Sequence, residues 1–190
     1  MTDKKANLMI REYTRTLDEW IEAMQLPSGL RSQMKEAQIV LLPAGYCNCP
    51  EAFAHDALDF LNYCQQTNRL KAEICCTDDN FSQIEMCSVK ISIGRIFALS
   101  TVTGTIFWNV FSCYIYDKLK EYAEQPVPAA ETEKPEYMEE PECSFSIIIT
   151  DAEGKHIEVE YDGPASEIEQ VGKTIIQLTT ADESRKDSQN

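Results

Sequence analysis

Four side chains that could bind a metal or act as nucleophile and base lie within one short stretch: Cys47, Cys49, His55 and Cys64. Zn²⁺ favours four such ligands, but this spacing is not the C-x₂-C of structural zinc sites. His55 and Cys64 are nine residues apart on one predicted helix, about 900° of rotation, so they face opposite sides. A loop cysteine near a helix start could also be a nucleophile. No oxyanion-hole motif accompanies such a cysteine, so the sequence predicts no catalytic residue. The spacing of the four side chains predicts no metal ligand, and we expect no cofactor.

A hydroxyl-rich turn is the second place where chemistry could occur. Its hydroxyls and backbone N–H groups at a predicted helix start could hold a phosphate, although the turn lacks the lysine and spacing of a Walker A loop. Ligands of parallel sheets bind beyond the carboxyl ends of the strands, where residues 44–49 and 77–80 would meet the turn. A nucleotide-like ligand is therefore one alternative, and a simple helix cap is the other. The residues of this predicted site are Ser100, Thr101, Thr103, Gly104, Thr105 and Asp78.

The longest uncharged run, residues 96–116, contains that turn. Its length suits a membrane span, because about 20 apolar residues cross the hydrocarbon core. Asn109 and several hydroxyl side chains dilute its hydrophobicity. The run also divides into the end of an alternating strand, a turn, and a helix with one thin polar stripe. We therefore favour a buried strand and helix, with a single-span membrane protein as an alternative.

Composition narrows the classes of function. The 190 residues carry a formal net charge of −15 and include eight cysteines. Clustered Lys and Arg, which nucleic-acid binding requires, are missing from the sequence, so we expect no nucleic-acid partner. The N-terminal residues are charged and lack the apolar core of a signal peptide. We therefore expect a cytoplasmic protein whose cysteines are free thiols.

An apolar seam runs through the N-terminal region. Its residues are spaced 3-4-3-4, which predicts an amphipathic helix over residues 6–25. Two heptads are too short for a coiled coil, so the seam packs either on its own domain or on a protein partner. The predicted partner-binding residues are Ile10, Tyr13, Leu17, Trp20 and Met24.

The elements that follow alternate between strand and helix. Apolar runs predict strands at residues 37–43 and 70–76 and from residue 89, and helical periodicity predicts helices at 50–68 and 105–123. This pattern is typical of an α/β fold. We expect a small three-layer domain over residues 1–124, with a short, largely parallel sheet.

The rest of the chain divides into three segments. Residues 125–142 hold four prolines and six glutamates, which predicts an extended linker. Residues 143–180 predict a β-hairpin followed by a helix, because Phe145, Ile147 and Ile149 and then Ile157, Val159 and Tyr161 alternate with polar residues. This docking module is too small to fold alone, and residues 181–190 are expected to be disordered. Together these features favour an accessory or regulatory protein that acts through a protein partner or as a homo-oligomer.

Overall fold

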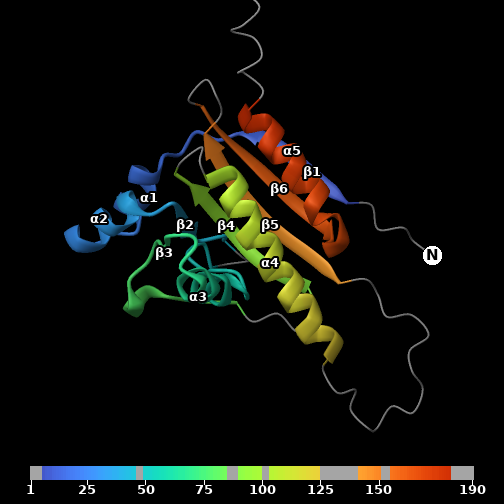
Figure 1. Ribbon diagram of the computed structural model, residues 1–190. Coiled ribbons are helices and arrows are strands. Elements are labelled where there is room, and N and C mark those ends of the chain that lie inside the picture. Colours follow the sequence, from blue (N-terminus) through green and yellow to red (C-terminus); the bar gives the residue numbers. More distant parts are fainter. Residues whose placement is uncertain are drawn as a thin grey trace, which may run out of the picture.

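The computed structural model describes residues 6–45, 49–84, 90–99, 103–124, 141–150 and 155–180, without the side chains of residues 103–105, 123, 124 and 180. In this part of the chain, five α-helices pack around a six-stranded sheet (Figure 1), which confirms the predicted α/β class. The strands are β1 (Asn7–Glu12), β2 (Ile39–Leu42), β3 (Ala72–Ile74), β4 (Lys90–Ala98), β5 (Glu142–Thr150) and β6 (His156–Pro164). The α-helices are α1 (Leu17–Ala23), α2 (Ser28–Glu36), α3 (Ala57–Thr67), α4 (Thr103–Glu124) and α5 (Ile168–Thr180).

The strand order across the sheet is β1-β6-β5-β4-β2-β3. Only β2–β3 and β4–β5 are parallel, and the other three neighbouring pairs are antiparallel. The sheet is therefore mixed, where a largely parallel one was expected. The hairpin β5–β6 continues the sheet of the first 124 residues, because β5 pairs with β4 along most of its length. The predicted linker, apart from its last two residues, and the predicted tail lie outside the described residues.

The prediction of one helix over residues 6–25 is wrong. Residues 7–12 form β1 and pair with β6 instead. The helix α1 begins only after Thr16, whose hydroxyl accepts a hydrogen bond from the N–H of Glu19 while the Glu19 carboxylate accepts one from the Thr16 N–H. This capping box fixes a helix start that the longer apolar periodicity concealed.

The uncharged run divides as predicted into the end of β4 and the helix α4. Residues 100–102, the centre of the predicted turn, lie outside the described residues. Asn109 and Tyr116 of the polar stripe are exposed, while Phe107, Phe111 and Ile115 are buried. Among the described residues, no helix is long and apolar enough to span a membrane.

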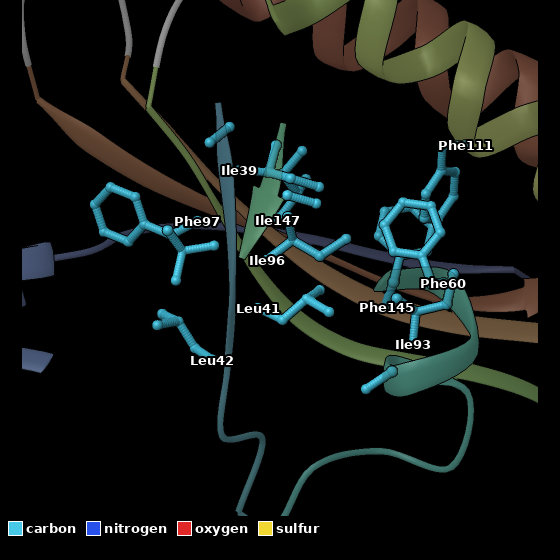
Figure 2. Close-up of a cluster of buried hydrophobic side chains, with 14 of the residues drawn as sticks. Ile39, Leu41, Leu42, Phe60, Ile93, Ile96, Phe97, Phe111, Phe145 and Ile147 are labelled. Atoms are coloured by element: carbon cyan, nitrogen blue, oxygen red, sulfur yellow. The ribbon is translucent and has the colours of Figure 1, made fainter. Parts of the chain in front are cut away.

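Aromatic side chains fill the space between the sheet and its helices. The ring of Phe111 on α4 lies 4.8 Å from that of Phe145 on β5 and 5.5 Å from that of Phe60 on α3. Figure 2 shows these rings gathered with Ile93 of β4, and in Figure 1 the helices α4 and α5 cross the face of the sheet together. Edge-to-face packing of this kind stabilises a core beyond its buried area.

Two local features differ from the sequence-based expectation. The third helix begins at Ala57 rather than near Pro50, and in the segment before it Phe53 forms an isolated bridge with Gln83. The helix α2 was not predicted. It begins at Ser28, with Pro27 at its N-cap position.

Candidate functional site

The face of the sheet opposite α4 carries a polar surface on four neighbouring strands. Side chains alternate along each strand, so the residues between the buried apolar positions of β1, β6, β5 and β4 share this face. In the strand registers, Arg11 lies across from Glu158, and Ser146 lies across from both Glu160 and Arg95. We call this surface the open face; its polar residues are Arg11, Lys90, Ser92, Arg95, Ser144, Ser146, Glu158, Glu160 and Asp162.

Glu158 lies at the centre of the open face and is only 1% exposed. Its Oε2 accepts a hydrogen bond from Arg11 Nε at 2.8 Å, and its Oε1 accepts from Arg95 Nε at 3.1 Å and from Ser146 Oγ at 2.5 Å. Burial opposes its ionisation, but the hydrogen bonds from Ser146 and Arg11 and the two positive charges outweigh burial and lower its pKa. One carboxylate therefore ties four adjacent strands together.

A groove of about 300 Å³ lies beside this cluster. Lys90 Nζ pairs with the Asp162 carboxylate at 2.7 Å on its rim, and Ser144 Oγ donates to Ser92 Oγ at 3.2 Å within it. Gly94 shapes the groove where β4 bulges. Its φ of +83° favours glycine, and a Cβ added there would lie 2.9 Å from the Cβ of Ala54.

Glu158 is poorly suited to act as a general base. A general base works best when its pKa lies near the operating pH, whereas that of Glu158 is held below its ordinary value. The Ser146 hydroxyl donates a hydrogen bond to this carboxylate, but so weak a base has little tendency to remove the hydroxyl proton and activate Ser146 as a nucleophile. What the cluster does is structural: through Arg11 it fixes β1 to β6.

The strand β1 forms one edge of the sheet and all six of its residues are exposed. Leu8, Met9 and Ile10 are 38%, 45% and 46% exposed. These three make up half of the six large apolar side chains that are exposed in the described part of the chain. A long, apolar, exposed edge strand is a template for pairing with another strand.

The hydrogen bonds of β1 show which backbone groups face outward. Tyr13 N–H donates to the His156 carbonyl at 2.9 Å, and hydrogen-bonded pairs alternate along an antiparallel ladder. Arg11 and Met9 therefore direct their backbone groups toward β6, two and four residues before Tyr13. Leu8, Ile10 and Glu12 direct theirs away from the sheet, where β1 has no neighbouring strand among the described residues. We call this side of β1 the open edge.

The opposite edge of the sheet, β3, is protected. It has only three residues, and Ala72 is buried. Lys71, immediately before it, donates its backbone N–H to the Gln38 side chain at 2.8 Å and pairs with Glu36 at 3.1 Å. A short edge strand flanked by charge resists pairing, so the two edges of the sheet differ in their capacity to accept a strand.

The structure does not bring the predicted phosphate site together. Asp78 is exposed in a 3₁₀ turn, Asp78–Asn80, that follows β3. Thr103, Gly104 and Thr105 begin α4, which follows the far end of β4. Because β4 runs antiparallel to β2, Ala98 lies beside the first residue of β2 rather than its last, and the segments that we expected to converge lie at opposite ends of the sheet. Ser100 and Thr101 lie outside the described residues.

The predicted partner-binding seam divides between two elements. Leu17, Trp20 and Met24 are 7–8% exposed and pack into the core of this chain. The hydroxyl of Tyr13 accepts a hydrogen bond from Trp20 Nε1 at 2.8 Å. Of the five predicted residues, Ile10 alone is exposed, on β1. The sequence signal that could have located the open edge is the apolar triplet at residues 8–10. A helical seam spaced 3-4-3-4 uses only one of these three residues, Ile10, and leaves the other two unexplained.

The cysteine and histidine residues that the structure describes form no recognisable centre. Within the described ranges, no three His, Cys, Asp or Glu side chains are placed to hold a metal ion. Burial raises the pKa of Cys64, Cys75 and Cys143 to about 12, which leaves them as inert thiols at neutral pH. Cys49 is exposed, and Cys47 lies outside the described residues.

A second buried carboxylate, Asp56, joins α3 to β4. Its backbone N–H donates to the Ser92 carbonyl at 2.9 Å, and its Oδ2 accepts from the Ser92 N–H at 2.7 Å. Burial raises the pKa of Asp56, and the hydrogen bond from Ser92 opposes this only in part. We call this pair of hydrogen bonds the Asp56 clamp; it holds the start of α3 against the β4 bulge.

The chain matches no protein-family model and shows no significant similarity to a curated protein or a solved structure. Its functional assignment therefore depends on the geometry of its own residues.

Proposed function

We propose that this protein acts through protein–protein contacts and that its binding site is the open edge of β1, which accepts a strand from another polypeptide chain. The observation that carries the proposal is the combination, on one edge strand, of three exposed apolar side chains and outward-facing backbone groups. Main-chain hydrogen bonds supply affinity in strand addition, and alternate side chains supply specificity.

The anchoring of β1 supports this proposal. Arg11 holds the strand to the buried carboxylate of Glu158 at 2.8 Å, and the β1–β6 register is continuous over all six residues. A strand that is fixed before binding loses little conformational entropy when a partner pairs with it. The open edge is therefore preorganised for strand addition.

Proline substitution at a position with an outward N–H tests the proposal. Ile10→Pro removes one outward donor and no β1–β6 hydrogen bond, and edge strands tolerate such a proline. Ile10→Thr is the matched control, because it keeps the donor and the β-branched shape. Met9→Pro removes a donor to β6, so we expect it to destabilise the protein itself.

The measurement is the native mass of the tagged chain in a lysate of cells that express it, followed by amide exchange of the isolated species. We expect the wild type and Ile10→Thr to elute as an assembly larger than the monomer, with slow exchange of the backbone amides at positions 8 and 10. Ile10→Pro should elute as a folded monomer whose remaining outward amides exchange fast. An assembly of unchanged size for Ile10→Pro contradicts the proposal.

A further inference from the structure

The proposed strand addition leaves open which chain supplies the strand. Resting on that proposal, we infer that the open edge of β1 accepts β1 of a second copy of this chain. The two strands pair antiparallel about a two-fold axis at Met9, which lies opposite the second copy's Met9. Leu8 lies opposite the second copy's Ile10, and the two six-stranded sheets become continuous.

The hydrogen-bonding phase of β1 restricts the possible registers. Only residues with outward backbone groups can form the new hydrogen-bonded pairs, and on β1 these are Leu8, Ile10 and Glu12. In the inferred register Leu8 and Ile10 form two such pairs related by the axis. Both side chains lie on the face that carries α4 and α5, because they are opposite Tyr161 and Val159 of the buried side of β6. Apolar side chains therefore meet apolar side chains.

Charge and polarity select the same register. It places Arg11 opposite the second copy's Asn7, so no like charges face each other across the pair of strands. A shift of the second copy in one direction places Leu8 opposite Glu12 and Met9 opposite Arg11. A shift in the other direction leaves Leu8 opposite Leu8 and moves Ile10 opposite Ala6, so only one pair of large apolar side chains remains. Apolar side chains directly opposite one another stabilise a sheet, so of these three registers the inferred one matches the described residues of β1 best.

Other occupants fit the open edge less well. The long segments of this chain outside the structure, residues 125–140 and 181–190, are rich in charged and polar residues or proline and have no alternating apolar pattern. They therefore offer no alternating row of apolar side chains to match that of β1. A basic strand from another protein would match the net charge of −15, but Arg11 and Glu12 leave β1 itself without net charge.

Cysteine substitution reads the register directly. In the inferred register the two Met9 Cα atoms form a non-hydrogen-bonded pair about 4.5 Å apart, within the range of a disulfide. We therefore expect Met9→Cys to form an intermolecular disulfide in the purified full-length protein under mild oxidation, identified by peptide mass spectrometry. Asn7→Cys is the matched control, because it lies on the same face but opposite the second copy's Arg11. Wild-type protein supplies the background from native cysteines.

Native mass and salt dependence complete the test. We expect the purified protein to have twice the monomer mass. Ile10→Pro should be monomeric, whereas Ile10→Thr should remain a dimer. Because each chain carries a net charge of −15, added salt should screen the repulsion between the two copies and tighten their association. Cross-linking by Leu8→Cys or Ile10→Cys in place of Met9→Cys overturns the register. If the purified protein is a monomer, the inference that a second copy pairs with β1 is wrong. If the assembly in the lysate is nevertheless lost with Ile10→Pro, the proposed strand addition still holds, with a strand from another protein.

Discussion

At the scale of single residues, the environment of Glu158 decides its role. Its position in an alternating strand, between His156 and Glu160, is that of a solvated acidic residue. The fold instead places Glu158 between the side chains of Arg11 and Arg95, with which it pairs, and leaves it almost fully buried. A buried carboxylate persists only when it is paired and hydrogen-bonded, and both conditions hold here.

The lowered pKa of Glu158 predicts how its contribution to stability depends on pH. The folded pKa lies below the ordinary value of 4.5, so the ionised side chain stabilises the folded state above that pH. This contribution is lost as the pH falls through 4.5 toward the folded pKa. We expect Glu158→Gln to lower the free energy of unfolding at pH 7 by about 2 kcal/mol, a typical value for hydrogen bonds to a charged group.

Urea unfolding of the wild type and Glu158→Gln at pH 7 and at pH 3.5, roughly one unit below the ordinary Glu pKa, checks this prediction. The difference in stability between the two proteins should shrink at the lower pH. Glu160→Gln is the control, since Glu160 lies on the same strand and face but is half exposed. A stability difference that does not depend on pH would contradict the assigned role of Glu158.

At the scale of elements, the Asp56 clamp explains why α3 begins where it does. The helical pattern reaches back to Pro50, but α3 begins at Ala57, after the residue that bonds twice to Ser92 of β4. The β4 bulge at Gly94 lies next to the same contact. The start of α3 and the bulge in β4 are therefore two parts of one packing arrangement. The local periodicity of the sequence does not encode this arrangement.

The raised pKa of Asp56 predicts opposite effects for two substitutions. Its folded pKa lies above the ordinary value of 3.8, so ionisation destabilises the folded state as the pH rises through this window. Asp56→Asn keeps an oxygen acceptor for the Ser92 N–H and removes the buried charge. We expect it to be at least as stable as the wild type at pH 7. Asp56→Ala leaves that N–H without its acceptor and should cost about 1–2 kcal/mol.

Chemical denaturation at pH 7 compares the two Asp56 variants with the wild type. If Asp56→Asn is as unstable as Asp56→Ala, the charge of Asp56 is needed and burial is not its dominant cost. Within the same experiment, the wild type should gain stability relative to Asp56→Asn as the pH is lowered toward about 4, close to the ordinary Asp pKa.

At the scale of the whole molecule, the C-terminal hairpin is part of the central sheet. β5 lies between β4 and β6 in the strand order, and Phe145 of β5 contacts Phe111 of α4. A polypeptide of residues 1–124 would expose one side of β4 and the apolar face of α4 to solvent. We therefore expect it not to fold, although the sequence pattern alone predicts an α/β domain over the same residues.

Far-UV circular dichroism and amide NMR dispersion of residues 1–124 measure this expectation. The matched control is residues 1–180, which retains every described element and should match the full chain. Dispersed amide signals from residues 1–124 would show instead that the first domain is autonomous and that the hairpin only adds to its edge.

The sequence by itself determined those elements whose local pattern agrees with their final environment. The alternating residues of β4, β5 and β6 form strands, and the uncharged run divides into a strand and α4. These segments are predictable because burial of one face follows directly from the spacing of apolar residues. Even the apolar seam was partly informative, since Leu17, Trp20 and Met24 are buried together around α1.

Only the tertiary structure decided where those elements lie relative to one another. The direction of β4, antiparallel to β2, separates the two halves of the predicted phosphate site. Pairing with β6 makes a strand of residues 7–12, which helical periodicity had included in a helix. The physical reason is common to both. Strand direction and edge position depend on hydrogen bonds between segments far apart in the sequence, as between Tyr13 and His156, and local propensity is silent about them.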